Sequence, residues 1–294
     1  MNRKYQIAVI QLNLNDTPSN NLIKCTQWVT QAAQQGAEVI CLPELYSSHY
    51  FCQSEDTDNF SIAEELYSTS FVAFSSLAKE LGIVIIVPFF EKRMAGIYHN
   101  SAYIIDVDGS EAGLYRKMHI PDDPHFYEKF YFTPGDIGFK TFPTKKGKIG
   151  TLICWDQWYP EAARLTALKG ADVLFYPTAI GWHPKEKEEY GVNQYGAWMN
   201  VMKGHAVANG VYVAAANRIG LEKYLPNTDG LEFWGASFSA GPQGEILAQA
   251  SHDKEEILIA EVDLDLQENV RQNWPFFRDR RIDAFGDITK RAID

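Results

Sequence analysis

Two stretches of this 294-residue chain decide its fold: GAEVICLPE at residues 36–44 and GADVLFYPT at residues 170–178. Each contains a glycine that ends a helix, an acidic residue, an apolar strand and a proline near the strand's exit. The repeat predicts two similar α/β halves, each built around a buried strand. Because each half would leave one sheet face apolar, we expect these two faces to pack together, with the helices outside.

The segments around the two stretches alternate between helix and strand patterns. In the first half, helical patterns cover residues 19–35 and about 61–81, and strand patterns cover 5–12, 83–88, 101–107 and 112–117. In the second half, helical patterns cover 160–169 and about 193–209, and strand patterns cover 148–154, 171–177, 211–216 and 256–262. The predicted fold class is α/β, an α-β-β-α four-layer sandwich with two packed mixed sheets and outer helices.

The chain shows no proline-rich or charged linker between its halves. We therefore predict a single domain over residues 1–294. Its C-terminal tail, from about 265 to 294, is rich in aromatic and charged residues. This composition is typical of a segment that packs against the domain or against a neighbouring subunit.

Composition and charge exclude several classes of function. Hydrophobic residues make up 46% and charged residues 22%, as in soluble globular proteins, and the net charge is −11. An acidic surface repels phosphate backbones and anionic lipid, so we predict neither a nucleic-acid nor a membrane partner. The N-terminal pattern predicts a strand and not a signal peptide, and the four cysteines are expected to be reduced thiols, so we predict a cytoplasmic protein.

Three residues with catalytic potential fall at predicted strand ends. Glu44 follows one strand, Lys117 ends the return strand of a hairpin, and Cys154 ends a strand just before a helix. At a strand-to-helix turn, free backbone N–H groups and the helix dipole favour the thiolate form of Cys154. Taken singly, the three residues are better explained as a loop or capping carboxylate, a surface lysine and a core thiol. Together, a base, a cation and a thiol indicate nucleophilic catalysis.

The motifs around these residues resemble a known family. They are PEL at residues 43–45, YRK at 115–117 and CWD at 154–156. In this order they resemble the Glu-Lys-Cys triad of the nitrilase superfamily, the carbon–nitrogen hydrolases that act on amides, nitriles and ureido groups. The resemblance extends over essentially the whole chain.

The resemblance implies a role for each catalytic residue. Glu44 would be the proton acceptor, Lys117 the stabiliser of the oxyanion and Cys154 the nucleophile. Glu128, in the loop-rich segment 118–147, would be a supporting glutamate. The resemblance also implies that no metal or organic cofactor is needed, and that the chain forms homo-oligomers built from dimers.

Further segments narrow the resemblance to one branch of the family. They are YFCQ at residues 50–53, HIPD at 119–122, EKFYF at 128–132, PGD at 134–136 and WPFFRDRR at 274–281. That branch hydrolyses N-carbamoylputrescine, a cationic ureido compound, to putrescine, carbon dioxide and ammonia, a step of polyamine biosynthesis from agmatine. A β-ureidopropionase or an aliphatic amidase of the same fold is the alternative.

A ureido amine needs a carboxylate or an aromatic group at the far end of its site. We predict Asp122 for that role or for the entrance, and Tyr50 and Trp155 for the walls. Plant members of the branch carry an acidic residue where this chain has His183, so we predict that His183 contacts the substrate. This departure leaves open which ureido or amide compound is preferred and which residue holds its distal amine.

Overall fold

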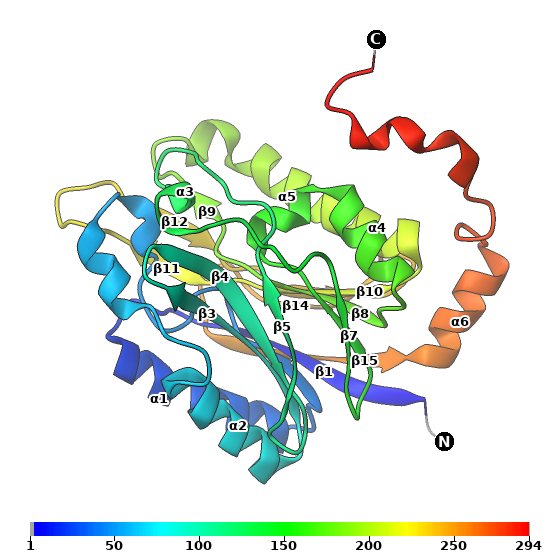
Figure 1. Cartoon of the computed structure of the whole chain (residues 1–294), viewed down its shortest axis with the longest axis horizontal. Helices are drawn as coiled ribbons and strands as arrows, with labels where there is room; N and C mark the ends of the chain where they lie inside the picture. The colour runs from blue at the N-terminus through cyan, green and yellow to red at the C-terminus, as the bar shows by residue number, and fades with distance from the viewer. Residues whose placement is uncertain (1–2, 294) are drawn as a thin grey trace.

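Two six-stranded mixed sheets form the centre of the protein in the computed structural model, which describes residues 3–293 (Figure 1). The order of strands in the first sheet is β15 (Glu256–Asp263), β1 (Lys4–Gln11), β2 (Val39–Cys41), β3 (Val84–Met94), β4 (Ile97–Ile105) and β5 (Glu111–Arg116). The order in the second sheet is β14 (Ile246–Gln249), β13 (Phe238–Ala240), β10 (Tyr212–Ala216), β8 (Val173–Pro177), β7 (Lys148–Thr151) and β6 (Thr141–Pro143).

The two sheets share one pairing pattern. In the first, β1, β2 and β3 are parallel, with antiparallel strands on both sides. In the second, β7, β8 and β10 are parallel, again with antiparallel strands on both sides. The two repeated sequence stretches form β2 and β8, the central strand of each parallel set. The two similar α/β halves that the repeat predicts are therefore confirmed.

Helices cover the outer face of each sheet (Figure 1). Helices α1 (Pro18–Gln34) and α2 (Thr69–Leu81) pack on the first sheet, and α4 (Pro160–Leu168) and α5 (Lys187–Asn209) pack on the second. The predicted α-β-β-α sandwich is confirmed. Among the helices of residues 3–293, none is long and apolar enough to cross a membrane.

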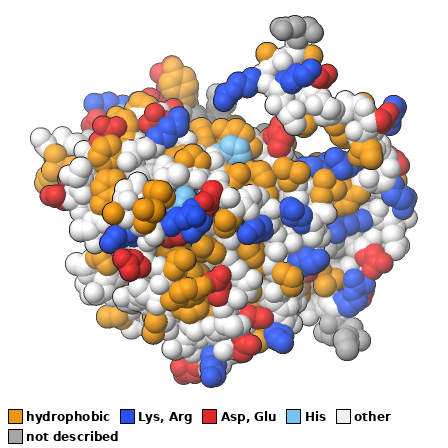
Figure 2. Space-filling view, in the orientation of Figure 1, with side chains coloured by type: hydrophobic (Ala, Val, Ile, Leu, Met, Phe, Trp, Pro, Cys, Tyr) orange, Lys and Arg blue, Asp and Glu red, His pale blue; other side chains and the backbone are white. Residues whose placement is uncertain are grey.

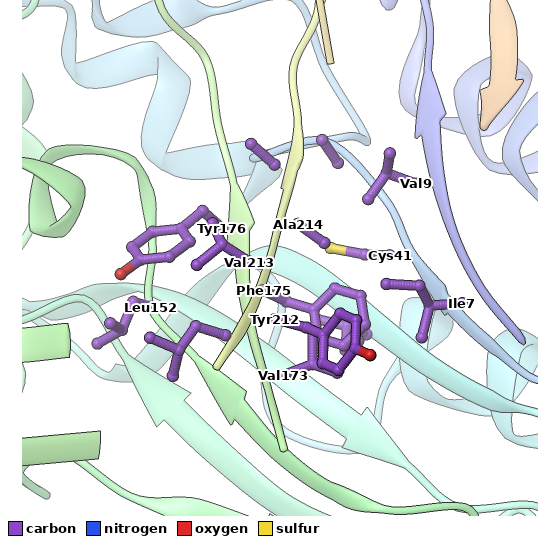
Figure 3. Packing of buried hydrophobic residues seen from close by; sticks show 14 of the residues in the cluster. Ile7, Val9, Cys41, Leu152, Val173, Phe175, Tyr176, Tyr212, Val213 and Ala214 are labelled. Carbon is purple, nitrogen blue, oxygen red and sulfur yellow. The ribbon is translucent and has the colours of Figure 1, made fainter. Parts of the chain in front are cut away.

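Strand β1 shows how alternation builds two cores. Ile7 and Val9 face the second sheet, whereas Ala8 and Ile10 face α1 and α2, because successive side chains of a strand point to opposite faces. Figure 3 shows Ile7, Val9 and Cys41 from the first sheet beside residues of the second: Val173, Phe175, Tyr212, Val213 and Ala214. A fully buried valine, isoleucine or phenylalanine side chain in this interface stabilises the sandwich by about 1.5–3 kcal/mol.

The remaining elements surround one end of the sandwich or follow it. Several are short: η1 (Phe51–Gln53), η2 (Thr57–Ile62), α3 (Glu128–Tyr131), η3 (Cys154–Trp158), β9 (Gly181–Trp182), β11 (Ile219–Glu222) and β12 (Leu231–Trp234). Strands β11, β12 and β9 form a small third sheet. After the last long strand come α6 (Leu264–Asn273), η4 (Ile282–Ala284) and η5 (Gly286–Thr289).

Two predicted helix starts were wrong. Helix α2 begins at Thr69 and not near residue 61, because Glu64 pairs with β3 and its carboxylate accepts a hydrogen bond from the Ser70 N–H at 2.8 Å. This bond satisfies one of the free N–H groups at the start of the helix. Helix α5 begins earlier than predicted, at Lys187, so it includes most of the charged run before residue 193.

The C-terminal tail divides into two parts. Helix α6 packs against the sandwich, where Arg271 Nε donates to the Gly210 carbonyl at 2.9 Å. Just beyond α6, the Phe277 ring lies 5.4 Å from the Arg164 guanidinium of α4. The chain then extends away from the body, and Figure 2 shows it as a projection with hydrophobic and basic side chains. Trp274 and Ile288 are 56% and 63% exposed. Packing of this segment on a neighbouring subunit stays a prediction.

Candidate active site

Three strand exits bring a carboxylate, an ammonium and a thiol to one end of the sandwich. Glu44 follows β2, Lys117 directly follows β5, and Cys154 follows β7 as the first residue of η3. Lys117 Nζ donates hydrogen bonds to Glu44 Oε1 at 2.8 Å and to Glu128 Oε2 at 2.7 Å. The side chains of all three bonded residues are fully buried. The structure thus joins three of the four predicted catalytic residues directly.

The two carboxylates keep Lys117 charged. Burial alone would lower the pKa of the ammonium, but Glu128 and Glu44 outweigh it and hold this pKa well above its usual value. Burial raises the pKa of Glu128 to about 7, although the neighbouring Lys117 acts in the opposite direction. The cluster therefore contains a fixed cation and at least one carboxyl group that titrates near neutral pH.

The two oxygens of Glu44 have different surroundings. Oε1 accepts hydrogen bonds from Lys117 and from Asn100 Nδ2, the latter at 2.6 Å. Oε2 is buried and has no hydrogen-bond partner among residues 3–293. Since Oε1 is occupied by two donors, Oε2 is the oxygen that is free to take a proton. Asn100 was missed by sequence reasoning; the only signal is a polar residue within a buried strand.

Cys154 is held in a strained and almost fully enclosed position. Its φ is 41°, in the left-handed region that costs a residue with a side chain about 1–3 kcal/mol, and it is 6% exposed. Burial and the nearby Glu44 raise the pKa of this thiol well above its usual value, although Lys117 lowers it. Desolvation of Cys154 therefore acts against the helix start, which favours the thiolate. The thiol therefore needs a base to become the nucleophile.

A buried carboxylate, Asp156, connects the exit of β5 to the turn at Cys154. It accepts hydrogen bonds from the Ile153 N–H at 3.0 Å, the Tyr115 hydroxyl at 2.7 Å and His119 Nδ1 at 2.7 Å. Tyr115 and His119 lie two residues before and after Lys117 in the sequence. Asp156 therefore fixes the lysine segment relative to the nucleophile. Sequence reasoning quoted this residue only as part of a motif.

A cavity of about 450 Å³ lies against Cys154. Aromatic residues line much of it: Phe126, Trp155, Trp158 and Trp234. Polar side chains also reach it, among them Asp123, His183 and Glu186. Within residues 3–293, no group of three or more His, Cys, Asp or Glu side chains could hold a metal ion. The cavity combines apolar walls with carboxylates, as a site for an alkyl cation requires.

The four residues predicted to contact substrate lie in different places. Trp155 and His183 line the cavity. Tyr50 is fully buried behind it, and its hydroxyl donates to Glu128 Oε1 at 2.7 Å. Asp122 is half exposed and has its carboxylate 4.0 Å from Lys129, while its neighbour Asp123 lines the cavity. Of these two acidic residues, only Asp123 is among the residues that line the cavity, and the anchor of the amine stays a prediction.

The fold and this site define a class of enzyme that comparison confirms. Residues 6–272 match the family described as carbon-nitrogen hydrolase. A carbon-nitrogen hydrolase from Helicobacter pylori G27 has a crystal structure that matches with a TM-score of 0.95 at 46% identity, covering 99% of this chain and 100% of that one. The chain belongs to the carbon–nitrogen hydrolase family, the nitrilase superfamily.

Curated relatives narrow the similarity. The N-carbamoylputrescine amidase of Arabidopsis thaliana is 46% identical over 288 residues, covering 96% of this chain and 94% of that protein. The enzyme of the same name from Solanum tuberosum is 47% identical, covering 97% and 94%. A citrullinase from Francisella tularensis is 41% identical, covering 97% and 98%. All three names describe proteins that this chain is similar to.

Proposed function

We propose that this protein hydrolyses N-carbamoylputrescine to putrescine, carbon dioxide and ammonia, with Cys154 as the nucleophile. One observation carries the proposal: the buried Glu44–Lys117–Glu128 cluster lies at a strained cysteine that faces a cavity. Similarity to N-carbamoylputrescine amidases over nearly the whole chain supports this choice of substrate.

The first half of the reaction forms a covalent intermediate. Glu44 Oε2 takes the thiol proton while Cys154 Sγ attacks the ureido carbon. The Lys117 ammonium and the Trp155 backbone N–H stabilise the oxyanion, a donor of this kind being worth about 3–4 kcal/mol of barrier. The C–N bond to the terminal nitrogen then breaks, and Glu44 returns the proton to release ammonia. The alkyl-carbamoyl group stays on sulfur as an S-thiocarbamate.

The second half releases the product. Glu44 takes a proton from water, the hydroxide adds to the thiocarbamate carbon, and the C–S bond breaks as the proton returns to Cys154. The released alkyl carbamic acid loses carbon dioxide and leaves the amine. Glu128 fixes Lys117 throughout, and its charge favours the protonated lysine. The chemistry needs only these side chains and water.

The mouth of the cavity suits a distal ammonium group. Asp123 and Glu186 supply negative charge at the lining, and Trp155, Trp158 and Phe126 supply apolar and aromatic surface. A four-carbon chain between the ureido group and the amine would lie along these rings while its charge stays near the carboxylates. This assignment moves the predicted amine anchor from Asp122 to Asp123.

His183 favours a second candidate. Its Nδ1 is buried with no hydrogen-bond partner among residues 3–293, and the ring lines the cavity beside His125. An imidazole in this place could donate to a distal carboxylate, so a ureido acid is the alternative substrate class. The relative named citrullinase is 41% identical to this chain, close to the values for the amidases, so ureido acids are included among the substrates to be tested.

Ammonia release separates the candidates. We expect N-carbamoylputrescine to give a kcat/KM at least tenfold above those of citrulline, N-carbamoyl-β-alanine, glutamine and a simple nitrile. Cys154→Ala and Cys154→Ser should abolish turnover of every substrate while circular dichroism shows an intact fold. A preference for an anionic compound would contradict the proposed substrate. An active Cys154→Ala variant would contradict the proposed mechanism.

We also propose that the enzyme is cytoplasmic and forms homo-oligomers built from dimers, with a small cationic ureido compound as its only ligand and neither nucleic acid nor membrane as a partner. Its four cysteines are buried free thiols, as a reducing compartment allows. The exposed aromatic residues after α6 supply apolar surface for contact between chains. Native mass spectrometry should show an even number of subunits.

A further inference from the structure

A buried ion pair lies behind the catalytic carboxylates and has no part in the mechanism above. Arg218 Nη2 and Glu222 Oε1 are 2.7 Å apart, and both side chains are fully buried. Arg218 lies between β10 and β11, and Glu222 ends β11, so both come from the second half of the chain. Buried ion pairs stabilise a fold little more than well-packed apolar residues do, so the pair calls for another explanation.

Arg218 binds the main chain that carries Glu44. Its Nη1 donates to the carbonyl oxygens of Glu44 and Leu45, both at 3.3 Å, and its Nη2 donates to the Ser48 carbonyl at 2.8 Å. Leu45 has a φ of 49°, which an unrestrained leucine would avoid. The planar guanidinium can serve several carbonyls and a carboxylate at once, which a lysine ammonium at the same place cannot do.

Glu222 reaches the second carboxylate through a tyrosine. Its Oε2 accepts a hydrogen bond from the Tyr50 N–H at 2.6 Å. The Tyr50 hydroxyl in turn donates to Glu128 Oε1 at 2.7 Å, and Glu128 Oε2 accepts from Lys117. One ion pair thus touches the backbone at Glu44 on one side and the support of Glu128 on the other.

We propose that Arg218 and Glu222 are positioning residues that set both carboxylates around Lys117 from behind. The proposal rests on the proposed function, in which Glu44 Oε2 must reach the thiol proton. A displacement of about 1 Å at a catalytic group can cost about 100-fold in rate. Because neither residue lines the cavity, loss of the pair affects kcat and leaves substrate affinity nearly unchanged.

The structure offers a matched control. Arg271 also donates to backbone carbonyls, those of Gly210 and Ala171, but at the opposite ends of β10 and β8 from the site. Arg271→Lys therefore removes a comparable set of bonds without touching either carboxylate. It should leave kcat within about twofold of the wild-type value, as expected of a site far from the chemistry.

Three variants test the proposal with N-carbamoylputrescine. Arg218→Lys keeps a positive charge for Glu222 but loses the planar guanidinium that binds several carbonyls at once. It should lower kcat at least tenfold and change KM less than threefold. The double variant Arg218→Met/Glu222→Gln removes both buried charges, so its Tm should recover relative to Arg218→Met alone while kcat stays low. A pure stability role predicts instead that kcat recovers together with Tm.

The pH profile of kcat/KM adds a readout that stability does not move. In Arg218→Lys the displaced carboxylates should shift the pH values at which kcat/KM rises and falls. In Arg271→Lys the carboxylates stay in place, so the profile should match that of the wild type. A wild-type kcat and profile in Arg218→Lys, or recovery of kcat in the double variant, would overturn the positioning role. An active Cys154→Ala variant in the same assay would instead show that the proposed function itself is wrong.

Discussion

The two halves of the chain build the same sheet but place different chemistry at their strand exits. After β2 the first half has Glu44, whereas Thr178 holds the corresponding place after β8, where its hydroxyl donates to the Tyr176 carbonyl at 2.9 Å and to Gln157 Oε1 at 3.4 Å. Three residues past β7 the second half has Cys154, whereas the residue three past β1 is Leu14, a core side chain. The repeated scaffold sets where groups can meet, and single residues at its exits decide what they do.

The halves also differ in electrostatics. The first supplies the charged groups at the site, Glu44, Lys117 and Glu128, whereas the second supplies an uncharged thiol on a strained backbone. Neither half is complete alone: the thiol lacks a base, and the charged cluster lacks a nucleophile. The predictions below remove or adjust this division, starting with the largest effect.

Lys117→Met should have the largest effect on activity, because it removes the cation that the first half supplies to the site. The oxyanion would lose a donor, which costs about 10²–10³ in kcat, and two buried carboxylates would lose their partner, at about 3–5 kcal/mol of stability. Ammonia release and urea unfolding measure the two effects. Lys129→Met, an exposed lysine nearby, is the control. Activity within tenfold of wild type in Lys117→Met would contradict this role.

The pH dependence of stability tests the charged cluster of the first half through Glu128. Its pKa is raised to about 7, so between pH 4.5 and 7 the folded protein keeps a proton that the unfolded chain has released. The contribution of Glu128 to the free energy of unfolding should therefore be largest below pH 4.5. It should fall by about 3 kcal/mol as the pH rises to 7.

Glu128→Gln should remove this slope, since an amide does not titrate. Urea unfolding at pH 5, 6, 7 and 8 for both proteins gives the difference. Groups far from Glu128 titrate equally in the two proteins, so the difference between the two curves reports on Glu128 and the residues that contact it. Parallel curves would show that Glu128 has an ordinary pKa in the folded state.

Asn100→Leu tests the orientation of Glu44 within the first half. The lost hydrogen bond reaches a charged group, and such bonds are worth about 1.5–3 kcal/mol, so kcat should fall about 10- to 100-fold. The neighbouring variant Ser101→Ala is the control, because that hydroxyl donates to Glu91. Equal losses of kcat in the two variants would refute a specific role for Asn100.

The smallest effect is expected at the cavity mouth. Asp123→Asn should raise KM for N-carbamoylputrescine up to about fivefold, since exposed charge pairs contribute at most about 1 kcal/mol. Asp122→Asn, one residue earlier and outside the lining, should change KM little. The reverse order of effects would restore Asp122 as the amine anchor.

Much of the fold and the four catalytic candidates could be predicted from the sequence because each follows a local pattern. The repeat at residues 36–44 and 170–178 gave the sandwich, and strand exits located Glu44, Lys117 and Cys154. The family resemblance added Glu128. These features depend on residues that are close together in the sequence, so they can be recognised without the structure.

Other features depend on side-chain direction and burial, which local patterns do not contain. Asn100 and Asp156 act on residues distant in the sequence, and no motif marks their partners. Tyr50 points at Glu128 and not into the cavity, and a shift of one residue exchanges Asp122 for Asp123. Desolvation of Cys154, which acts against the thiolate that the helix start favours, is produced by the whole fold and not by its neighbours in the sequence.

The central claim is that the Cys154 sulfur carries the acyl group. Partial alkylation with iodoacetamide, followed by peptide mass spectrometry and ammonia release on the same samples, tests it most directly. The account predicts that residual activity equals the fraction of chains with unmodified Cys154, regardless of the state of Cys25, Cys41 and Cys52. Undiminished activity in a sample whose Cys154 is completely alkylated would contradict it.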